Sequence, residues 1–378
     1  MSVKLSELRE VAAKNIAKLS WQEVADSPTA RFYTDWRAFE ALLAKGREEP
    51  LFSRPEGYWD AVLGPCGEHG DETSTFSSLI KPLDNKLAAA HYANLRDDAF
   101  SLLRLRDGSI SVALCEPHGD SWVSQHVVVE VPPKVRAELL LADLRAAPGS
   151  TVIEVFIGRG AQLSLLLISI PKTEGPVAHI VRKRLEEEAS LNAGMLASGT
   201  LMHRVEDDAV LAGSGSRYYY RGVTVGRGRE WVDYVVNMVQ LGAKTRAEAK
   251  ASGVALDGSK VVARGVAKVA ESARGAFSLF EADVMILGER AVGYTAPMME
   301  IDTGDVEFAT HHAAAFREPE DIIFYMASRG LSPSEAVSLI VNSRIGMVVE
   351  QLKDERLRNV AAQLASNLLH THAPEGRR

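Results

Sequence analysis

The side chains best suited to chemistry gather in the last third of the chain. Glu300, Asp302 and Asp305 supply carboxylates there. His311 and His312 supply imidazoles, which suit metal binding and proton transfer near neutral pH. In a strand, alternation sends the two histidines to opposite faces, so only one of them can address a given site. A hydrogen-bonded histidine at a strand end, without chemistry, is the simpler interpretation.

The two cysteines of the chain, Cys66 and Cys115, each begin a Cys-x-x-His motif. Together with His69 and His118 they could form a tetrahedral Cys2His2 zinc site, although surface loops with incidental histidines explain the pattern more simply. So few cysteines cannot build a disulfide framework and are typical of a reducing compartment. Two thiolates also cannot hold an ordinary four-cysteine iron–sulfur cluster within one chain.

The composition indicates a soluble globular protein. Apolar residues make up 46% of the 378 residues and charged residues 25%, with a net charge of −7. Asp and Glu (50) outnumber Lys and Arg (43), which predicts no binding to nucleic acid, because phosphate backbones attract basic proteins. No apolar run reaches the ~18–20 residues of a membrane helix, and the charged N-terminus does not resemble a signal peptide. We therefore expect a cytoplasmic protein without a membrane partner.

The elements that must position these residues fall into three predicted regions. Residues 1–99 are predicted to be helical, and the capping-box pattern of Ser20 and Glu23 predicts a short second helix there. Residues 100–318 contain short β-prone runs separated by glycines. These runs predict a large sandwich or a solenoid and do not distinguish between the two. Residues 319–378 return to helix.

The strongest local signal lies at the start of the C-terminal region. Ser332, Pro333 and Glu335 combine an N-cap serine, a proline in the first turn and a capping-box glutamate. A helix is therefore predicted to begin at Pro333. The spacing of residues along this helix predicts the face that packs against the core. That face consists of Ala336, Leu339, Ile340 and Ser343.

Five sequence blocks between residues 276 and 335 stand in a characteristic order and spacing. They are Phe280-Glu-Ala-Asp-Val-Met-Ile-Leu-Gly288, Pro297-Met-Met-Glu-Ile301, Asp305-Val306, Thr310-His311 followed by Ala313, and Phe324-Tyr325-Met-Ala-Ser328-Arg329-Gly330. Together they resemble the core of the SufB/SufD family, the scaffold components of the Suf iron–sulfur cluster assembly system. The resemblance is specific over these blocks and looser over the preceding part, from about His203 to Gly265.

The resemblance implies a mainly β fold, namely a right-handed parallel β-helix, or solenoid, with α-helical regions at its N- and C-terminal ends. It implies a homodimer or heterodimer of two such β-helices, whose shared cluster-assembly interface includes Glu300, His311 and His312. It also implies that a Suf ABC-type ATPase docks on the C-terminal helical region. The residues carried over for this docking are Phe324, Tyr325, Arg329, Gly330 and Glu335.

Departures from the family pattern indicate a SufD-type member. Family members often carry a cysteine at the position of Ala309 and a glycine at the position of His312. The cysteine that SufB-type proteins use in building the cluster corresponds here to Ala282. A chain without these thiols needs a cysteine-bearing partner, since thiolates are the usual cluster ligands. The resemblance therefore implies no stably bound cofactor on the isolated chain, and a transient cluster at the shared interface.

Three functions follow from these observations. The first is a non-catalytic scaffold subunit of the Suf machinery, working with the ATPase and with a SufB-like chain or a second copy of itself. The second is a β-helix enzyme in which His311 and Glu300, with Asp302 or Asp305, perform acid–base chemistry on a small substrate or a carbohydrate. The third is a degenerate structural paralogue that binds the ATPase and handles no cluster.

Overall fold

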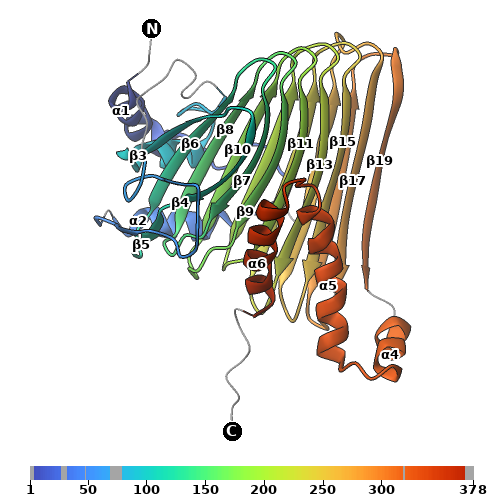
Figure 1. Cartoon of the computed structure of the whole chain (residues 1–378). Coiled ribbons are helices and arrows are strands. Elements are labelled where there is room, and N and C mark those ends of the chain that lie inside the picture. The colour runs from blue at the N-terminus through green and yellow to red at the C-terminus, as the bar shows by residue number, and fades with distance from the viewer. Residues whose placement is uncertain (1–3, 27–31, 47, 69–78, 318–319, 371–378) are drawn as a thin grey trace.

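The computed structural model describes residues 4–26, 32–46, 48–68, 79–317 and 320–370. Two sheets of parallel strands wind together into a solenoid of stacked coils (Figure 1). One sheet of eight strands runs in the order β18-β16-β14-β12-β10-β8-β6-β3, and the other of nine strands runs in the order β19-β17-β15-β13-β11-β9-β7-β4-β2. The predicted parallel β-helix is therefore confirmed, and the sandwich that the local pattern left open is excluded.

The eight-stranded sheet consists of β3 (Leu95–Arg104), β6 (Val123–Val131), β8 (Gly149–Ile157), β10 (Val177–Leu185), β12 (His203–Leu211), β14 (Trp231–Gln240), β16 (Lys260–Val269) and β18 (Val292–Ile301). The nine-stranded sheet consists of β2 (Ala61–Leu63), β4 (Gly108–Leu114), β7 (Arg136–Asp143), β9 (Gln162–Ser169), β11 (Ser190–Ser198), β13 (Arg217–Gly226), β15 (Arg246–Ala255), β17 (Ala276–Ile286) and β19 (Val306–Arg317). Outside both sheets, β1 (Leu51–Ser53) pairs antiparallel with β5 (Glu116–His118).

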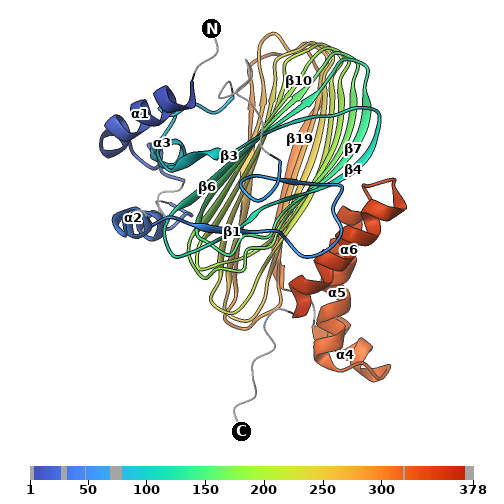
Figure 2. The ribbon, with the colours of Figure 1, turned by 60° about the vertical axis from the view of Figure 1, so that its left-hand side comes forward.

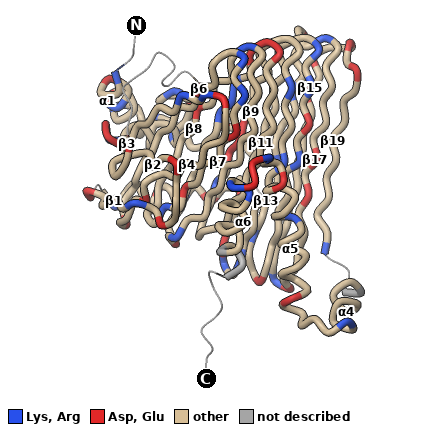
Figure 3. The backbone as a smooth tube through the Cα atoms, in the orientation of Figure 1, with Lys and Arg blue, Asp and Glu red and all other residues tan. Residues whose placement is uncertain are grey.

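Successive coils stack in register, so equivalent side chains lie above one another. Asp208 and Asn237, 29 residues apart, are hydrogen-bonded between neighbouring coils, and so are Ser252 and Asp283, 31 residues apart. Because alternate side chains point inward, each coil adds a layer of valine, leucine and alanine to one continuous interior core. On the outside, Lys, Arg, Asp and Glu are interspersed along the coils rather than separated by sign (Figure 3).

Helices cover the outer faces of both sheets, on two different sides of the solenoid (Figure 2). The N-terminal elements are α1 (Leu5–Asn15), the 3-10 turn η1 (Ile16–Lys18), α2 (Trp36–Ala44) and α3 (Lys86–Ala93). They share an apolar cluster with the outer face of the eight-stranded sheet. The predicted second helix at Ser20 is wrong over the described residues 20–26, which are not helical. Instead, the carbonyl of Ser20 accepts a hydrogen bond from the amide of Lys86, where α3 begins.

The C-terminal region consists of α4 (Glu320–Ser328), α5 (Pro333–Val349) and α6 (Glu355–His370). The predicted capping box is confirmed, because the Glu335 amide donates to Ser332 Oγ at 3.3 Å and the Ser332 amide donates to Glu335 Oε2 at 2.7 Å. Helices α5 and α6 pack on the outer face of the nine-stranded sheet. In the described part of the chain, no helix is both long and apolar enough to cross a membrane.

The predicted inner face of α5 is correct at Ala336 and wrong at Leu339 and Ser343. Leu339 is 49% exposed and Ser343 is also exposed. Most residues of this helix are apolar, so spacing alone allows several stripes. The surface of β11 and β13 selects one of them. The selected side chains are those of Ala336, Val341, Ile345, Val348 and Val349.

Candidate functional site

The last coil of the solenoid, formed by β18 and β19, leaves both sheets with an open edge. Each of the two strands pairs with a neighbour on one side only within the described chain. Large apolar side chains are exposed along this coil, in contrast to the buried interior of earlier coils. They are Val292, Tyr294, Met298, Ile301 and Phe308. An unpaired edge strand is a template for pairing with another chain, and apolar exposure on it favours such contact.

His311 and His312 leave β19 in opposite directions. His311 is in register with Phe280, which is fully buried in the interior core, so its side chain lies on the inward face of the last coil. His312 is in register with Glu281, which forms an ion pair with Lys250 at 3.4 Å on the outer surface. Both histidines are exposed, and the described elements that follow β19 are helices and not a further coil above His311. The inward face beside His311 therefore opens at the end of the solenoid.

Glu300 lies on the outer face of β18 and does not approach His311. Its carboxylate forms an ion pair with Lys268, one coil earlier, at 3.1 Å. Asp302 contacts the same ammonium at 3.6 Å. The Glu300 hydrogen bond, with the nearby carboxylate charges, raises the pKa of Lys268. Glu300 and His311 thus belong to different sheets and point different ways, which does not favour a shared acid–base site.

Two cavities of the described chain lie away from the last coil. The first, of about 430 Å³, lies over earlier coils and includes Pro132, Pro133 and Phe156 in its lining. The second, of about 370 Å³, lies between the N-terminal region and the eight-stranded sheet, beside Trp21 and Arg204. Neither is lined by residues of β18 or β19. His311 is itself exposed, so the inward face beside it is an open surface.

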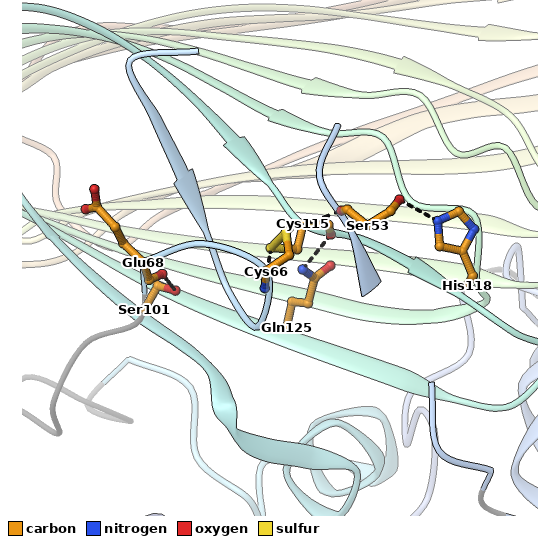
Figure 4. The surroundings of a disulfide bond; sticks show 7 residues. All are labelled: Ser53, Cys66, Glu68, Ser101, Cys115, His118 and Gln125. Carbon is orange, nitrogen blue, oxygen red and sulfur yellow. Dashed lines mark hydrogen bonds between the residues drawn. A yellow bond between two sulfur atoms is a disulfide. The ribbon is translucent and has the colours of Figure 1, made fainter. Parts of the chain in front are cut away.

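The zinc interpretation of the two Cys-x-x-His motifs is wrong in this structure. Cys66 and Cys115 are joined in a disulfide, which the sequence analysis did not predict (Figure 4). His118 instead forms a hydrogen bond from Nε2 to Ser53 Oγ at 2.7 Å. His69 lies outside the described residues. Within the described part of the chain, no group of three or more His, Cys, Asp or Glu side chains is placed to hold a metal ion.

A buried polar chain that the sequence analysis missed runs through the middle coils. His203 Nδ1 donates to the Ser198 carbonyl at 2.6 Å, which leaves His203 Nε2 as the acceptor for His179 Nδ1 at 3.0 Å. His179 Nε2 donates in turn to Asp143 Oδ2 at 2.9 Å. Burial opposes ionisation of Asp143, but Arg145 and His179 nevertheless lower the pKa of its carboxyl. The chain is fully enclosed, so its chemistry is that of stability and not of substrate turnover.

A second buried network fixes the N-terminal segment to the solenoid. Arg264 forms ion pairs with Asp233 and with Asp26, each at 2.8 Å. Arg204 contacts the same Asp233 at 2.8 Å and also donates to Thr34 Oγ1 at 3.0 Å. The sequence alone does not reveal these contacts. The number of residues in a coil decides which charged side chains lie next to one another, and that number must be known first.

The residues expected to dock an ATPase lie on and after α4, at the far C-terminal side of the structure (Figure 1). Phe324 is 75% exposed, and Tyr325 is exposed beside it. The guanidinium of Arg329 lies 5.2 Å from the Tyr325 ring centroid. Gly330 ends the helix with a φ of 94°, and Glu335 is occupied in the capping box. The first three residues are thus surface side chains, and the last two shape the connection to α5.

Comparisons with known proteins agree with this architecture. The profile of the family "SUF system FeS cluster assembly, SufBD core domain" matches residues 115–344. The chain is 23% identical over 312 residues to the iron-sulfur cluster assembly protein SufD of Bacillus subtilis, covering 79% of this chain and 70% of that protein. The iron-sulfur cluster assembly protein SufB of the same species is 26% identical over 208 residues, which is 54% of this chain and 44% of the relative.

A third relative is an iron-sulfur cluster assembly SufBD family protein of Synechocystis, 29% identical over 146 residues, or 39% of this chain and 30% of that protein. The matches to this protein and to SufB span less than half the length of those relatives. The family profile, by contrast, extends from the start of β5 through every later coil and into α5. Because that match covers more than half of the sequence and the whole of the last coil, this chain belongs to the SufBD family of the SUF iron–sulfur cluster assembly system.

Proposed function

We propose that this chain is a non-catalytic scaffold subunit of iron–sulfur cluster assembly, which offers its open last coil to a second β-helical chain. The observation that carries this proposal is the pair of unpaired edge strands, β18 and β19, with exposed apolar side chains along them. A partner whose own strands continue both sheets would satisfy these backbone groups and bury the apolar surface. The partner is a SufB-like chain, or a second copy of this one.

The cluster is the cargo of this interface and not a resident group of the isolated chain. Both cysteine sulfurs of this chain are bonded to each other at the opposite end of the solenoid. A cluster beside His311 therefore takes its thiolates from the partner, and His311 offers one imidazole from the inward face of the last coil. His312, which points outward, is expected to contribute little.

The proposed contact is tested by co-expressing the chain with a SufB-like subunit and measuring the mass of the complex in solution. Met298→Glu places a charge on the exposed edge, where Met298 is 54% exposed, and should weaken the complex at least tenfold. Leu201→Glu is the matched control, because Leu201 is 56% exposed and lies between β11 and β12. Equal weakening by both variants, or by neither, would place the contact elsewhere.

We further propose that an ABC-type ATPase binds the surface formed by Phe324, Tyr325 and Arg329. Exposed aromatic side chains beside an arginine are typical anchors of protein interfaces. Phe324→Ala should abolish retention of the cognate ATPase in a pull-down. Tyr58→Ala, at an aromatic side chain that is 79% exposed in the N-terminal region, should leave it unchanged. Retention of the ATPase by Phe324→Ala would reject this surface.

The acid–base enzyme is not favoured, because Glu300 and His311 point away from each other. The degenerate paralogue is distinguished by the cluster itself. Anaerobic reconstitution with iron and sulfide should load a cluster on the complex with the SufB-like chain and should leave the isolated chain without a stoichiometric cluster. If the SufB-like chain and the ATPase load the same amount of cluster with and without this chain, the degenerate paralogue is favoured.

A further inference from the structure

The Cys66–Cys115 disulfide (Figure 4) is formed beside β2 and β4, at the N-terminal end of the nine-stranded sheet. The strand order places β19 at the opposite end of that sheet. Cys115 directly follows β4, and Cys66 follows the three-residue edge strand β2. Between β2 and Cys66 the chain turns at Gly64, whose φ of 110° favours glycine. The bond therefore joins an edge strand to its only neighbour in the sheet, across a separation of 49 residues.

The two sulfurs differ in their access to solvent. Cys115 is fully buried, whereas Cys66 is half-buried. The amide of Cys66 donates a hydrogen bond to Cys115 Sγ at 3.0 Å. An incoming thiolate can therefore reach only Cys66, and the sulfur that leaves is Cys115, whose negative charge this amide stabilises.

The same surroundings also accommodate the reduced pair. The sulfur of Cys66 lies 3.3 Å from the carbonyl oxygen of Ser53, which would accept a hydrogen bond from a thiol. Cys115 keeps the amide of Cys66 as its partner, and its own carbonyl accepts from Gln125 Nε2 at 2.9 Å. Backbone bonds continue to hold the loop, since the Cys115 amide donates to the Leu63 carbonyl at 2.9 Å. Reduction thus removes the covalent bond without leaving either sulfur unpartnered.

We propose that Cys66 and Cys115 form a reversible thiol–disulfide exchange site whose substrate is a dithiol reductant, and that Cys66 is the sulfur attacked. One thiolate of the dithiol bonds to Cys66 Sγ while the Cys66–Cys115 bond breaks, and Cys115 leaves as a thiolate and takes up a proton. The second thiol of the reductant then displaces Cys66, which is protonated in turn. Two electrons pass to the protein, which gains two thiols, and the reductant becomes a disulfide.

The structural consequence concerns the edge strand β2. In the oxidised chain, β2 is held on β4 by a covalent bond in addition to backbone hydrogen bonds at its ends, such as that from the Asp60 amide to the Ser111 carbonyl at 3.0 Å. In the reduced chain the hydrogen bonds and the packing of Leu63 in the core remain without the covalent bond, so β2 opens more often and uncovers the buried edge of β4. We call β2 and residues 64–68 the N-terminal cap of the solenoid. The exchange site therefore sets the stability of this cap, independently of the partner proposed for the opposite end.

The first test identifies the sulfur that is attacked. The full-length oxidised chain is treated briefly with glutathione, quenched with acid and mapped by peptide mass spectrometry. We expect the mixed disulfide on Cys66 in at least tenfold excess over Cys115, and two free thiols after treatment with dithiothreitol under native conditions. A mixed disulfide chiefly on Cys115, or a bond that dithiothreitol opens only after denaturation, would overturn the proposal. Two free thiols in the chain after air oxidation would also overturn it.

The second test measures the cap without relying on variants that fail to fold. Hydrogen exchange is compared between the oxidised and reduced wild-type chain. Amides of β2 and of residues 64–68 should exchange at least tenfold faster after reduction, and those of β17, at the other end of the nine-stranded sheet, should not change. Cys66→Ser should reproduce the reduced pattern and remove its response to dithiothreitol. Uniform acceleration along the chain, or no change in β2, would contradict a local cap.

Discussion

Acid should destabilise this chain through His203, one of the buried histidines of the middle coils. The Nδ1 proton of His203 is donated to the Ser198 carbonyl, and its Nε2 accepts from His179. A second proton on His203 would remove that acceptor and would place a positive charge beside His179 and Arg145. Because the side chain is fully buried, no water is available to solvate this charge.

The size of the effect follows from the pKa of His203. Burial, together with the nearby His179, lowers it from an ordinary 6.5 to about 3. Between these two values the unfolded chain binds a proton at this position that the folded chain does not bind. The free energy of unfolding therefore decreases as the pH falls, by about 1.4 kcal/mol per pH unit, or about 3 kcal/mol between pH 6.5 and 4. Above pH 6.5 the contribution is fully present.

Two half-buried carboxyls, those of Asp208 and Glu230, contribute to the pH dependence in the opposite direction and partly mask this slope. Burial raises the pKa of Asp208 to about 6 and that of Glu230 to about 7. The folded chain takes up protons at these acids before the unfolded chain does, so their contribution to stability increases on acidification. The pH dependence of the parent chain's free energy of unfolding is thus a sum of opposing contributions. The contribution of His203 is obtained from the difference in stability between the parent and a His203 variant.

The assay is urea unfolding of the parent and of His203→Gln at about pH 7, 5.5 and 4.5, followed by circular dichroism. A glutamine keeps one donor and one acceptor but cannot titrate. The stability difference between parent and variant should therefore shrink or reverse by about 2.5 kcal/mol from pH 7 to 4.5. The free energy of unfolding of His312→Gln, a variant at an exposed histidine, should change with pH as that of the parent does. If the free energy of unfolding of His203→Gln also changed with pH as that of the parent does, the assignment of a neutral, buried His203 would be refuted.

Three further predictions concern local features. Ser332→Ala removes the cap of α5 and should lower the free energy of unfolding by about 1 kcal/mol in urea titrations, whereas Ser338→Ala, inside the same helix, should change it by less than about 0.5 kcal/mol. Arg264→Met leaves Asp26 without its guanidinium and Asp233 with only that of Arg204, so it should cost about 3 kcal/mol, with faster proteolysis of the N-terminal segment. His311→Ala should leave the melting temperature unchanged and lower cluster transfer from the assembled complex to an apo-acceptor, and His312→Gly should alter neither. Equal losses from the two histidine variants would show that the register of β19 is shifted by one residue.

Much of the fold was predictable, because its strongest signals are local. Glycine-separated β-prone runs predicted the strand-rich region over residues 100–318, and the capping box placed the start of α5. Strands β10 and β12 give a weaker local signal, because charged residues interrupt their apolar pattern. The interior holds Lys183 and Asp207 as a buried ion pair between these neighbouring strands. A charge whose partner lies one coil away cannot be distinguished locally from a solvated one.

The same limit explains what the sequence revealed of the candidate site. Alternation alone was enough to separate the faces of His311 and His312, since it depends on adjacent residues. The ion pair of Glu300 with Lys268, 32 residues earlier, required the length of a coil, and the Cys66–Cys115 bond required β2 to lie beside β4. Contacts between coils are therefore the part of the site that needs a structure.

The two ends of the solenoid are finished differently, and this difference gives the proposed function its physical basis. At the N-terminal end, the short strand β2 closes the nine-stranded sheet under a disulfide, and helices α1 and α3 cover the outer face of the other sheet. At the C-terminal end, β18 and β19 are full-length strands of 10 and 12 residues with exposed apolar side chains. Stacked repeats normally end in a polar or covered cap, because an open edge exposes both backbone groups and core. A chain that caps one end and leaves the other open has one end suited to continuing its sheets into a second protein.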